Sequence, residues 1–340
     1  MRWALIGASD VSERRMLPAL RAAGERATRI YSSNLERARR YAARHDVEQA
    51  TSDLARALDE GVDAVYVSSA NQHHAVHVLA AAGAGRHVLC EKPLALAADD
   101  AFAMVETCQR NGVILGTNHH LRGSEVLREL SRQVVAGTIG ELRSARVQNA
   151  IALSERLRTW RISGSDEGGG VAFDLAVHDI DALRFVLGRE LVEVTALAAS
   201  QALGADGVED VLVSAHRYDA DVMAVAHEAY TVPFTRTLIE VHGSAGSLTA
   251  IDALRPDSVG RLRLLDGDGE RLIELAPSEG MYVRTVRDFC RAVNEGGSPA
   301  ATGVDGVKSL LGALALRESA VTGQSVSLAP PELTEQEPTR

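Results

Sequence analysis

Two side chains suited to acid–base chemistry lie four residues apart in a largely apolar stretch, GGGVAFDLAVHDIDALRFVLG, at residues 168–188. They are Asp174 and His178. Residues four apart share one face of a helix, so the carboxylate would lie one turn from the imidazole. Such a pair can hold a histidine in one tautomer with a pKa near neutrality, as a general acid or base requires. A surface pair, or a hydrogen-bonded core histidine, explains the spacing equally well.

A lysine follows a second apolar stretch. HVLC at 87–90 predicts a buried strand, and EKP at 91–93 ends it. Ligands of parallel sheets bind beyond the carboxyl ends of the strands, where Lys92 could donate to a substrate oxygen that gains charge. The alternative is a Lys–Pro turn with an exposed ammonium group. NHH at 118–120 follows another strand in the same way, so either histidine could line the pocket.

The turn after the first strand, GASDVS at 7–12, has the position of a dinucleotide-binding loop. That fingerprint has three glycines, but here only Gly7 is present, with Ser9 and Ser12 at the other two positions. Small hydroxyl residues still allow phosphate oxygens to approach backbone N–H groups at a helix N-terminus. Asp10 would repel a pyrophosphate unless its side chain points away. An ordinary strand-to-helix turn is the alternative.

The end of the second strand bears on cofactor preference. NAD sites usually place an acidic residue here, on the ribose 2′-hydroxyl. This chain has Ser32, Ser33 and Asn34, with Arg37 one turn further on. Hydroxyl groups and a guanidinium suit a 2′-phosphate, so we predict that NADP is preferred and that NAD remains possible. The alternative is that the arginines of 37–44 form a solvated helix face.

The pattern around these residues predicts an α/β protein with two domains. Apolar strands and helices alternate from residue 2 to about 136, which is typical of a doubly wound parallel (Rossmann) sheet covered on both faces. After residue 140, longer alternating strands predict an open, mainly antiparallel sheet in an α+β domain. The helix over 168–188 should cover one face of that sheet, and helices near 280–294 and 304–321 should complete the domain. We therefore expect a nucleotide-binding domain at 1–120, a substrate-binding domain at 121–325 and a flexible tail at 326–340.

Composition narrows the class of protein. A formal charge of −10 over 340 residues argues against nucleic acid and anionic membranes as partners. No apolar run is long enough to span a bilayer, and the N-terminus does not resemble a signal peptide. Three scattered cysteines predict free thiols and a cytoplasmic location. His74 and His77 form an HxxH pair among apolar neighbours, which we interpret as structural, so no metal is expected.

Several of these stretches together resemble the Gfo/Idh/MocA oxidoreductase family. They are RWALIGAS, DAVYVSS, HVLCEKPLA, ILGTNHHLR, GGGVAFDLAVHDIDALRFVLG and EVHGSAGSL. The resemblance extends to about residue 325, and the longer stretches are most similar to bacterial 1,5-anhydro-D-fructose reductases. It implies a nicotinamide cofactor and a small sugar or sugar-derived substrate, with hydride transfer between nicotinamide and a carbonyl or alcohol carbon. An NAD-dependent inositol or aldose dehydrogenase is the alternative enzyme, and a non-enzymatic nucleotide sensor is a more distant one.

The resemblance also implies site residues. Lys92, Asp174 and His178 match the family's catalytic trio, and the Lys92–Pro93 bond is expected to be cis. Loops 152–167 and 232–236 are expected to set the substrate, and the oligomeric state stays open, from monomer to homo-oligomer. The expected cofactor-binding residues, the first turn included, are Gly7, Ala8, Ser9, Asp10, Val11, Ser32, Ser33, Arg37, Ser69, Asn71, His74, Glu91, Lys92, Asn118, Trp160, Arg161 and Tyr282.

Overall fold

The chain forms two compact units. The computed structural model describes residues 1–164, 167–205, 207–329 and 333. The first unit holds Met1–His120 with Tyr282–Val307, and the second holds Leu121–Met281 with the stretch that begins at Lys308. No helix within the described residues has the length and hydrophobicity needed to span a membrane.

The first unit is built on a parallel sheet of the predicted doubly wound kind, so the predicted fold class is confirmed for this part of the chain. Its six strands follow the order β3-β2-β1-β4-β5-β6, and every neighbouring pair is parallel. The order reverses direction between β1 and β4, which makes their carboxyl ends the ligand-binding edge of such a sheet. The strands are β1 (Arg2–Ile6), β2 (Arg26–Tyr31), β3 (Gln49–Thr51), β4 (Ala64–Val67), β5 (His87–Cys90) and β6 (Leu115–Thr117).

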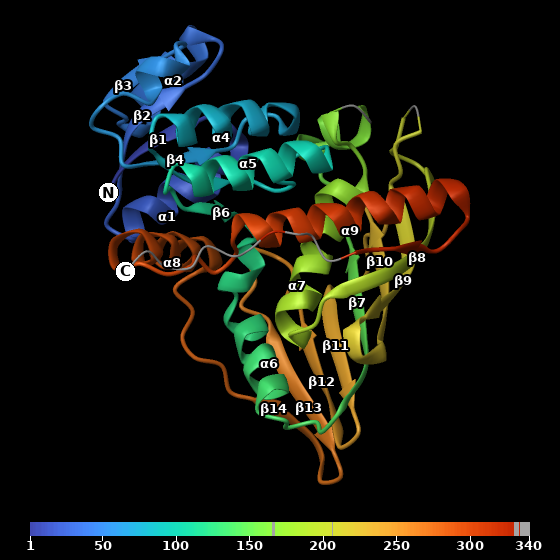
Figure 1. Ribbon diagram of the computed structural model, residues 1–340. Helices are drawn as coiled ribbons and strands as arrows, with labels where there is room; N and C mark the ends of the chain where they lie inside the picture. The colour runs from blue at the N-terminus through green and yellow to red at the C-terminus, as the bar shows by residue number, and fades with distance from the viewer. Residues whose placement is uncertain (165–166, 206, 330–332, 334–340) are drawn as a thin grey trace. The chain divides into compact units, whose positions relative to one another are not determined.

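Helices cover both faces of this sheet. On one face α4 and α5 pack side by side, and on the other an apolar cluster joins α1, α2 and α8 to the strands (Figure 1). The central strands β4 and β5 are largely apolar and buried because both faces are covered. The helices are α1 (Leu17–Ala22), α2 (Leu35–His45), α3 (Leu54–Ala57), α4 (His74–Gly83), α5 (Ala98–Arg110) and α8 (Met281–Glu295).

Helix α8 corrects one expectation. The sequence analysis assigns residues 280–294 to the second domain, but all of α8 except Met281 belongs to the first unit. Its apolar face includes Phe289, whose ring centroid lies 5.3 Å from that of Trp3. Amphipathic periodicity shows that a helix covers some apolar surface, but it does not identify which surface. Chain order alone therefore assigned this helix to the wrong sheet.

The second unit is built on a nine-stranded sheet in the order β14-β13-β12-β11-β7-β10-β9-β8-β15. Neighbouring strands are antiparallel except for β7 and β10, which pair in parallel. The predicted mainly antiparallel sheet is therefore confirmed. The strands are β7 (Leu142–Ala150), β8 (Leu191–Ala199), β9 (Val211–Tyr218), β10 (Val222–Ala229), β11 (Leu238–Gly243), β12 (Gly246–Ile251), β13 (Arg261–Asp266), β14 (Gly269–Ile273) and β15 (Val326–Ser327).

One face of the nine-stranded sheet is covered by helices. Figure 1 shows α6 (Glu125–Val135) and α7 (Val177–Leu187) on this face, and both contact its strands. Along most of β9 and β10 buried residues alternate with exposed ones, as expected for a sheet with one covered face. The last helix, α9 (Gly303–Thr322), begins in the first unit and continues in the second.

The expected tail also needs correction at its start. Residues 326–340 are expected to be flexible, but Val326 and Ser327 form β15 and pair with Val194 and Glu193 of β8. The Leu328 amide also donates to the Val192 carbonyl. A two-residue strand carries too little periodicity to be recognised in a sequence. The rest of this segment, except for 329 and 333, lies outside the described residues.

Candidate active site

The first turn of the nucleotide-binding sheet depends on Gly7. This residue has φ +114°, and a Cβ atom here would lie 2.7 Å from the Ser69 amide nitrogen. Only glycine therefore allows β1 to turn this close to the segment after β4. Ser9 joins the same two segments, because its hydroxyl donates to Ser68 Oγ at 2.8 Å. It also accepts the Ser12 amide at 3.1 Å, which satisfies one N–H at the start of the helix.

The two other polar residues of this turn, Ser12 and Asp10, both have partners within the protein. Ser12 is fully buried, and its hydroxyl lies 3.0 Å from Tyr41 Oη. Its position in the fingerprint is thus used for packing on α2. Asp10 is exposed and pairs with Arg14 Nε at 2.8 Å. That ion pair offsets the negative charge that would otherwise oppose a pyrophosphate.

Residues after β2 reach back to the first turn. Asn34 caps α2 by accepting the Arg37 amide at 3.0 Å, and Ser32 Oγ accepts the Asn34 amide at 3.3 Å. The Arg37 guanidinium donates to the Ala8 carbonyl at 2.6 Å. Ser33 is exposed beside them. The structure therefore brings together the polar residues that the sequence analysis selected at the ends of β1 and β2.

The segment after β4 carries a group of histidines. His74 is fully buried; its Nδ1 lies 2.9 Å from the Pro93 carbonyl and its Nε2 3.1 Å from the Ser69 carbonyl. Burial lowers its pKa. His77 Nδ1 lies 2.9 Å from Ser69 Oγ, and burial lowers the pKa of His77 to about 4. Both histidines join backbone segments, which agrees with the structural interpretation of the HxxH pair.

The carboxyl ends of β4, β5 and β6 meet at Glu91. This buried carboxylate accepts hydrogen bonds from Tyr66 Oη and Asn118 Nδ2 on the same oxygen, and burial raises its pKa. Lys92 follows, half-buried, with the expected cis bond to Pro93. The sequence analysis missed Tyr66. Tyr66 lies in the apolar strand β4, where a tyrosine looks like an ordinary core residue. Only the pairing of β4 with β5 shows that its hydroxyl reaches Glu91.

Two aromatic rings stack at the end of β6. His120 and Tyr282 have centroids 4.7 Å apart and planes inclined by 18°. Burial, with smaller effects from Lys92 and His119, lowers the pKa of His120 to about 3, so this imidazole is neutral. Tyr282 is the second residue of α8 and was selected through the family resemblance. Its stacking on His120 places it within the first unit, 162 residues along the chain from its partner.

In the second unit, Asp174 and His178 lie at the junction of a π-helical turn, Ala172–Ala176, with α7. Both residues are buried. Single π-helical turns within helices occur frequently at functional sites. The helix therefore departs from α-helical geometry over the turn that contains Asp174, which simple helical spacing does not predict.

Asp174 is held from two directions. Arg161 Nε donates to its Oδ2 atom at 2.8 Å, and Tyr230 Oη donates to the same oxygen at 3.0 Å. Tyr230 Oη also lies 3.3 Å from the Gly170 carbonyl. The Arg161 guanidinium packs over the Trp160 ring, 4.5 Å from its centroid. The sequence analysis selected Trp160 and Arg161 as cofactor contacts and missed Tyr230.

The last of the three glycines before this helix, Gly170, makes room for a carboxylate. Glu209 Oε1 accepts the Ala172 amide at 3.1 Å, at the N-terminus of the helical segment. Gly170 has φ +101°, and a Cβ atom here would lie 2.2 Å from Glu209 Oε1. Glu209 is the third residue that sequence reasoning missed, although an acidic pair at 209–210 before a strand is a visible signal.

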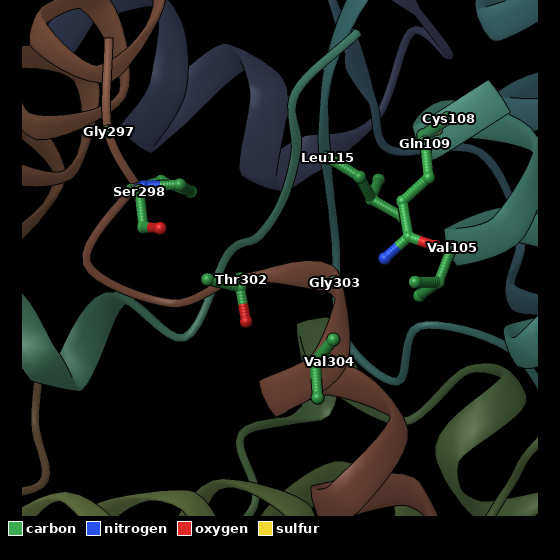
Figure 2. Close-up of a pocket in the computed structure, with 10 residues that line it drawn as sticks. Val105, Cys108, Gln109, Leu115, Gly297, Ser298, Thr302, Gly303 and Val304 are labelled. Carbon is green, nitrogen blue, oxygen red and sulfur yellow. The ribbon is translucent and has the colours of Figure 1, made fainter. Parts of the chain in front are cut away.

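One small cavity of the first unit has a volume of about 30 Å³, room for roughly one water molecule. Figure 2 shows its lining, which includes Val105, Cys108 and Gln109 of α5, Leu115 at the start of β6 and Val304. Because α5 ends and β6 begins there, the cavity is at the amino end of the strands, opposite the ligand-binding edge. It is neither large enough nor correctly placed to hold a substrate.

Comparisons with known proteins agree with this geometry. Residues 1–119 match the oxidoreductase family with an NAD-binding Rossmann fold, and residues 127–249 match the GFO/IDH/MocA C-terminal domain. The chain belongs to the GFO/IDH/MocA oxidoreductase family. It is therefore an NAD(P)-dependent sugar oxidoreductase that acts on CH–OH or carbonyl groups, as the sequence resemblance implied.

Individual members of the family are similar over most of their length. A 1,5-anhydro-D-fructose reductase of Ensifer adhaerens is 39% identical over 96% of this chain and 98% of its own. A myo-inositol 2-dehydrogenase of Thermotoga maritima is 31% identical over 79% of this chain and 81% of its own. The solved structure of an aldose–aldose oxidoreductase from Caulobacter crescentus with glycerol superposes with a TM-score of 0.88 at 25% identity, covering 96% of this chain and 99% of that one.

Proposed function

We propose that the protein is an NADPH-dependent reductase of 1,5-anhydro-D-fructose or a closely similar sugar ketone. The observation that carries the proposal is the near full-length similarity to the Ensifer enzyme, at 39% identity over 96% of the chain. The residues selected for chemistry, Lys92, Asp174 and His178, are all present in the family motifs EKP and GGGxxxDxxxHDxD.

Each residue has a distinct role in this proposal. Bound NADPH supplies the hydride. His178 donates a proton to the alkoxide that develops at the reduced carbon, and Asp174 orients the imidazole and stabilises its protonated form. Lys92 donates to the substrate oxygen, which makes the carbonyl carbon more electrophilic. In the oxidative direction the same groups act in reverse, with His178 as the base.

The preference for NADPH rests on the residues after β2. No acidic residue stands at positions 32–34 to receive a ribose 2′-hydroxyl, and Arg37 reaches the first turn through Ala8. A 2′-phosphate would gain a charge-assisted hydrogen bond from that guanidinium. Ser33→Asp should therefore shift the ratio of kcat/KM values from NADPH toward NADH, since a carboxylate repels the phosphate and accepts from the hydroxyl. An unchanged ratio would refute the assignment.

The deciding measurement is oxidation of NADPH and of NADH with 1,5-anhydro-D-fructose, beside a panel of ketoses and dicarbonyl sugars. Fast NADPH-dependent turnover of anhydrofructose supports the substrate, the cofactor and the reductive direction together. The alternative, an NAD-dependent polyol or aldose dehydrogenase, draws on the similarity to the inositol dehydrogenase. It predicts no reduction of anhydrofructose, and NAD reduction with myo-inositol or an aldose instead.

We also propose a cytoplasmic location. Its support is that Cys90, Cys108 and Cys290 are all buried and unbridged, as thiols are in reducing compartments. Alkylation of the denatured protein, purified from its own cells under acid quench, measures this directly. Three reactive thiols per chain are expected, and a disulfide in the purified protein would contradict the proposal.

A further inference from the structure

Two buried carboxyl groups face each other between α7 and the sheet, and the proposed reaction uses neither. They are Asp179, the residue after His178, and Glu228 on β10. Neither side chain is exposed to solvent. In the parallel pairing of β10 with β7, Glu228 stands opposite Asn149, and Asn149 Nδ2 donates to Asp179 Oδ1 at 3.0 Å. The register of the two strands thus places Glu228 next to Asn149, the residue that binds Asp179 of the helix.

Glu228 differs from the buried Asp181 and the half-buried Glu190 nearby. Asp181 accepts two hydrogen bonds from Arg122, at 2.9 and 2.7 Å. Glu190 accepts hydrogen bonds from Arg184 and Lys308. By contrast, neither oxygen of Glu228 has a donor among the described residues. An ionised carboxylate in such a place would be a fully buried charge without compensation, which is among the costliest arrangements in a protein.

A neutral Glu228 removes that cost and gains a donor. Its carboxylic O–H can donate to Asp179, the acceptor within hydrogen-bonding reach. Burial, the Asp179 charge and this hydrogen bond each raise the pKa of Glu228 well above its usual range. Two carboxyl groups that share a site cannot both ionise easily, so one proton stays on the pair. Asn149, which donates to Asp179, favours the charge there and the proton on Glu228.

We propose that Asp179 and Glu228 share one proton at neutral pH, and that this pair fixes α7 on the sheet and so positions His178. Glu228 is then a positioning residue that acts through Asp179. The positioning part rests on the proposed role of His178, whereas the shared proton is independent of the reaction.

The surrounding elements add few competing charges. From α7, Asp179 is the group that raises the pKa of Glu228 directly. From β9, Tyr218 is a neutral phenol whose own pKa is raised by burial, and His216 is a neutral imidazole with a pKa lowered by burial to about 4. From β7 the facing side chain is the uncharged Asn149. Ionisation of Glu228 at alkaline pH would therefore place two carboxylates in contact with no nearby cation acting on Glu228.

The first test detects the proton itself. Infrared difference spectra between the wild-type protein and Glu228→Gln should contain the carbonyl band of a protonated carboxylic acid, lost in the variant, at pH 7. Raising the pH of the wild-type protein alone should remove the same band while the fold is intact by circular dichroism. Absence of the band at pH 7 in the wild-type protein, with carboxylate bands only, would overturn the proposal even if no variant folds.

Stability provides the second test, with Asp181→Asn as the matched control. Each replaces a buried acid by its amide. The amide introduced by Glu228→Gln stays neutral at every pH, so this variant should be at least as stable as wild type at pH 7. Above the pKa of Glu228 in the unfolded chain, wild type loses folding stability as the pH rises and the variant does not. The ratio of their folding equilibrium constants should therefore grow by up to tenfold per pH unit, until the pKa of Glu228 in the folded protein is reached. Asp181→Asn should be less stable than wild type, because it removes the negative partner of Arg122. An equal, pH-independent loss in both variants would contradict the shared proton.

Kinetics separate positioning from bulk stability. With NADPH and 1,5-anhydro-D-fructose, Glu228→Gln should keep kcat within twofold, since the amide still donates to Asp179. Glu228→Leu cannot donate and should lower kcat at least tenfold while the KM for NADPH stays within twofold. Equal kcat values in the two variants would overturn the positioning role. If wild-type protein turns over no sugar, the proposed function fails, and the infrared band still decides the shared proton.

Discussion

Tyr230→Phe is the most incisive substitution at the candidate active site, because it removes one oxygen atom and nothing else. Tyr230 Oη donates to Asp174 Oδ2 at 3.0 Å and lies 3.3 Å from the Gly170 carbonyl. Its ring is fully buried, so phenylalanine fills the same space. We expect Asp174 to lose one of the two donors, Arg161 and Tyr230, that hold its Oδ2 atom.

The magnitude follows from the contacts that remain. A hydrogen bond to a charged group contributes about 1.5–3 kcal/mol, and about 1.4 kcal/mol corresponds to tenfold in rate. Arg161 Nε still holds the same oxygen at 2.8 Å in the variant. The lower part of that range therefore applies, and kcat should fall about tenfold. The KM for NADPH should change by less than about twofold, because Tyr230 is expected to act on the carboxylate rather than on the cofactor.

The assay is the steady-state rate of NADPH oxidation with 1,5-anhydro-D-fructose, with Tyr218→Phe as the control. Tyr218 is an equally buried tyrosine of the same sheet, and its hydroxyl has no hydrogen-bond partner among the described residues. Its removal should leave kcat within about twofold. If both variants keep wild-type activity, Asp174 does not depend on Tyr230. If both lose activity equally, the effect is one of packing.

A double-mutant cycle sharpens this test. Arg161→Lys keeps the positive charge but loses the Nε–H that donates to Asp174. Because Tyr230 and Arg161 share one acceptor oxygen, their effects on kcat should not add, with a coupling of about 0.5–3 kcal/mol. Strict additivity would show that the two donors act on different properties of the site.

Four further substitutions test other parts of the structure. His178→Ala, and likewise Lys92→Ala, should lower kcat by roughly two to four orders of magnitude with cofactor affinity near normal; full activity in either variant would remove that residue from the mechanism. Gly170→Ala places a Cβ against Glu209 at φ +101° and should cost about 2 kcal/mol of stability, measured by thermal unfolding; Gly137→Ala, also at positive φ but in open space, should cost less. Burial lowers the pKa of His216 to about 4, so between pH 6.5 and 4 the unfolded chain binds a proton that the folded chain does not. Stability should therefore decrease as the pH is lowered through this range. His216→Gln should flatten this dependence, and an unchanged slope would contradict it.

Local sequence patterns predicted most elements and the positions of the polar residues on them. Asp174 and His178 were expected on one helix, and Lys92 and Asn118 after buried strands, because periodicity and strand ends are local properties. The partners of those residues were not predictable in this way. Tyr230 lies 56 residues from Asp174 in the chain, and no local pattern distinguishes a tyrosine at a strand end that bonds a carboxylate from one that packs. The sheet that α8 covers and the short strand β15 were missed for the same reason.

The polar residues of the Asp174–Leu187 segment explain how a helix buried on almost every side can present one histidine in a fixed direction. Apolar packing is non-directional, so a helix surrounded by alanine, valine and leucine could rotate or slide at little cost. Here four buried polar residues have directed partners: Asp174 has Arg161 and Tyr230, Asp179 has Asn149, Asp181 has Arg122, and Arg184 has Glu190. These partners come from strand β7, from the end of β10 and from segments outside the strands. Only the observed orientation of the helix therefore allows all of these hydrogen bonds at once. These directed partners therefore fix the orientation of the helix, and substitutions at these positions should lower kcat as well as stability, as expected for Asp181→Asn.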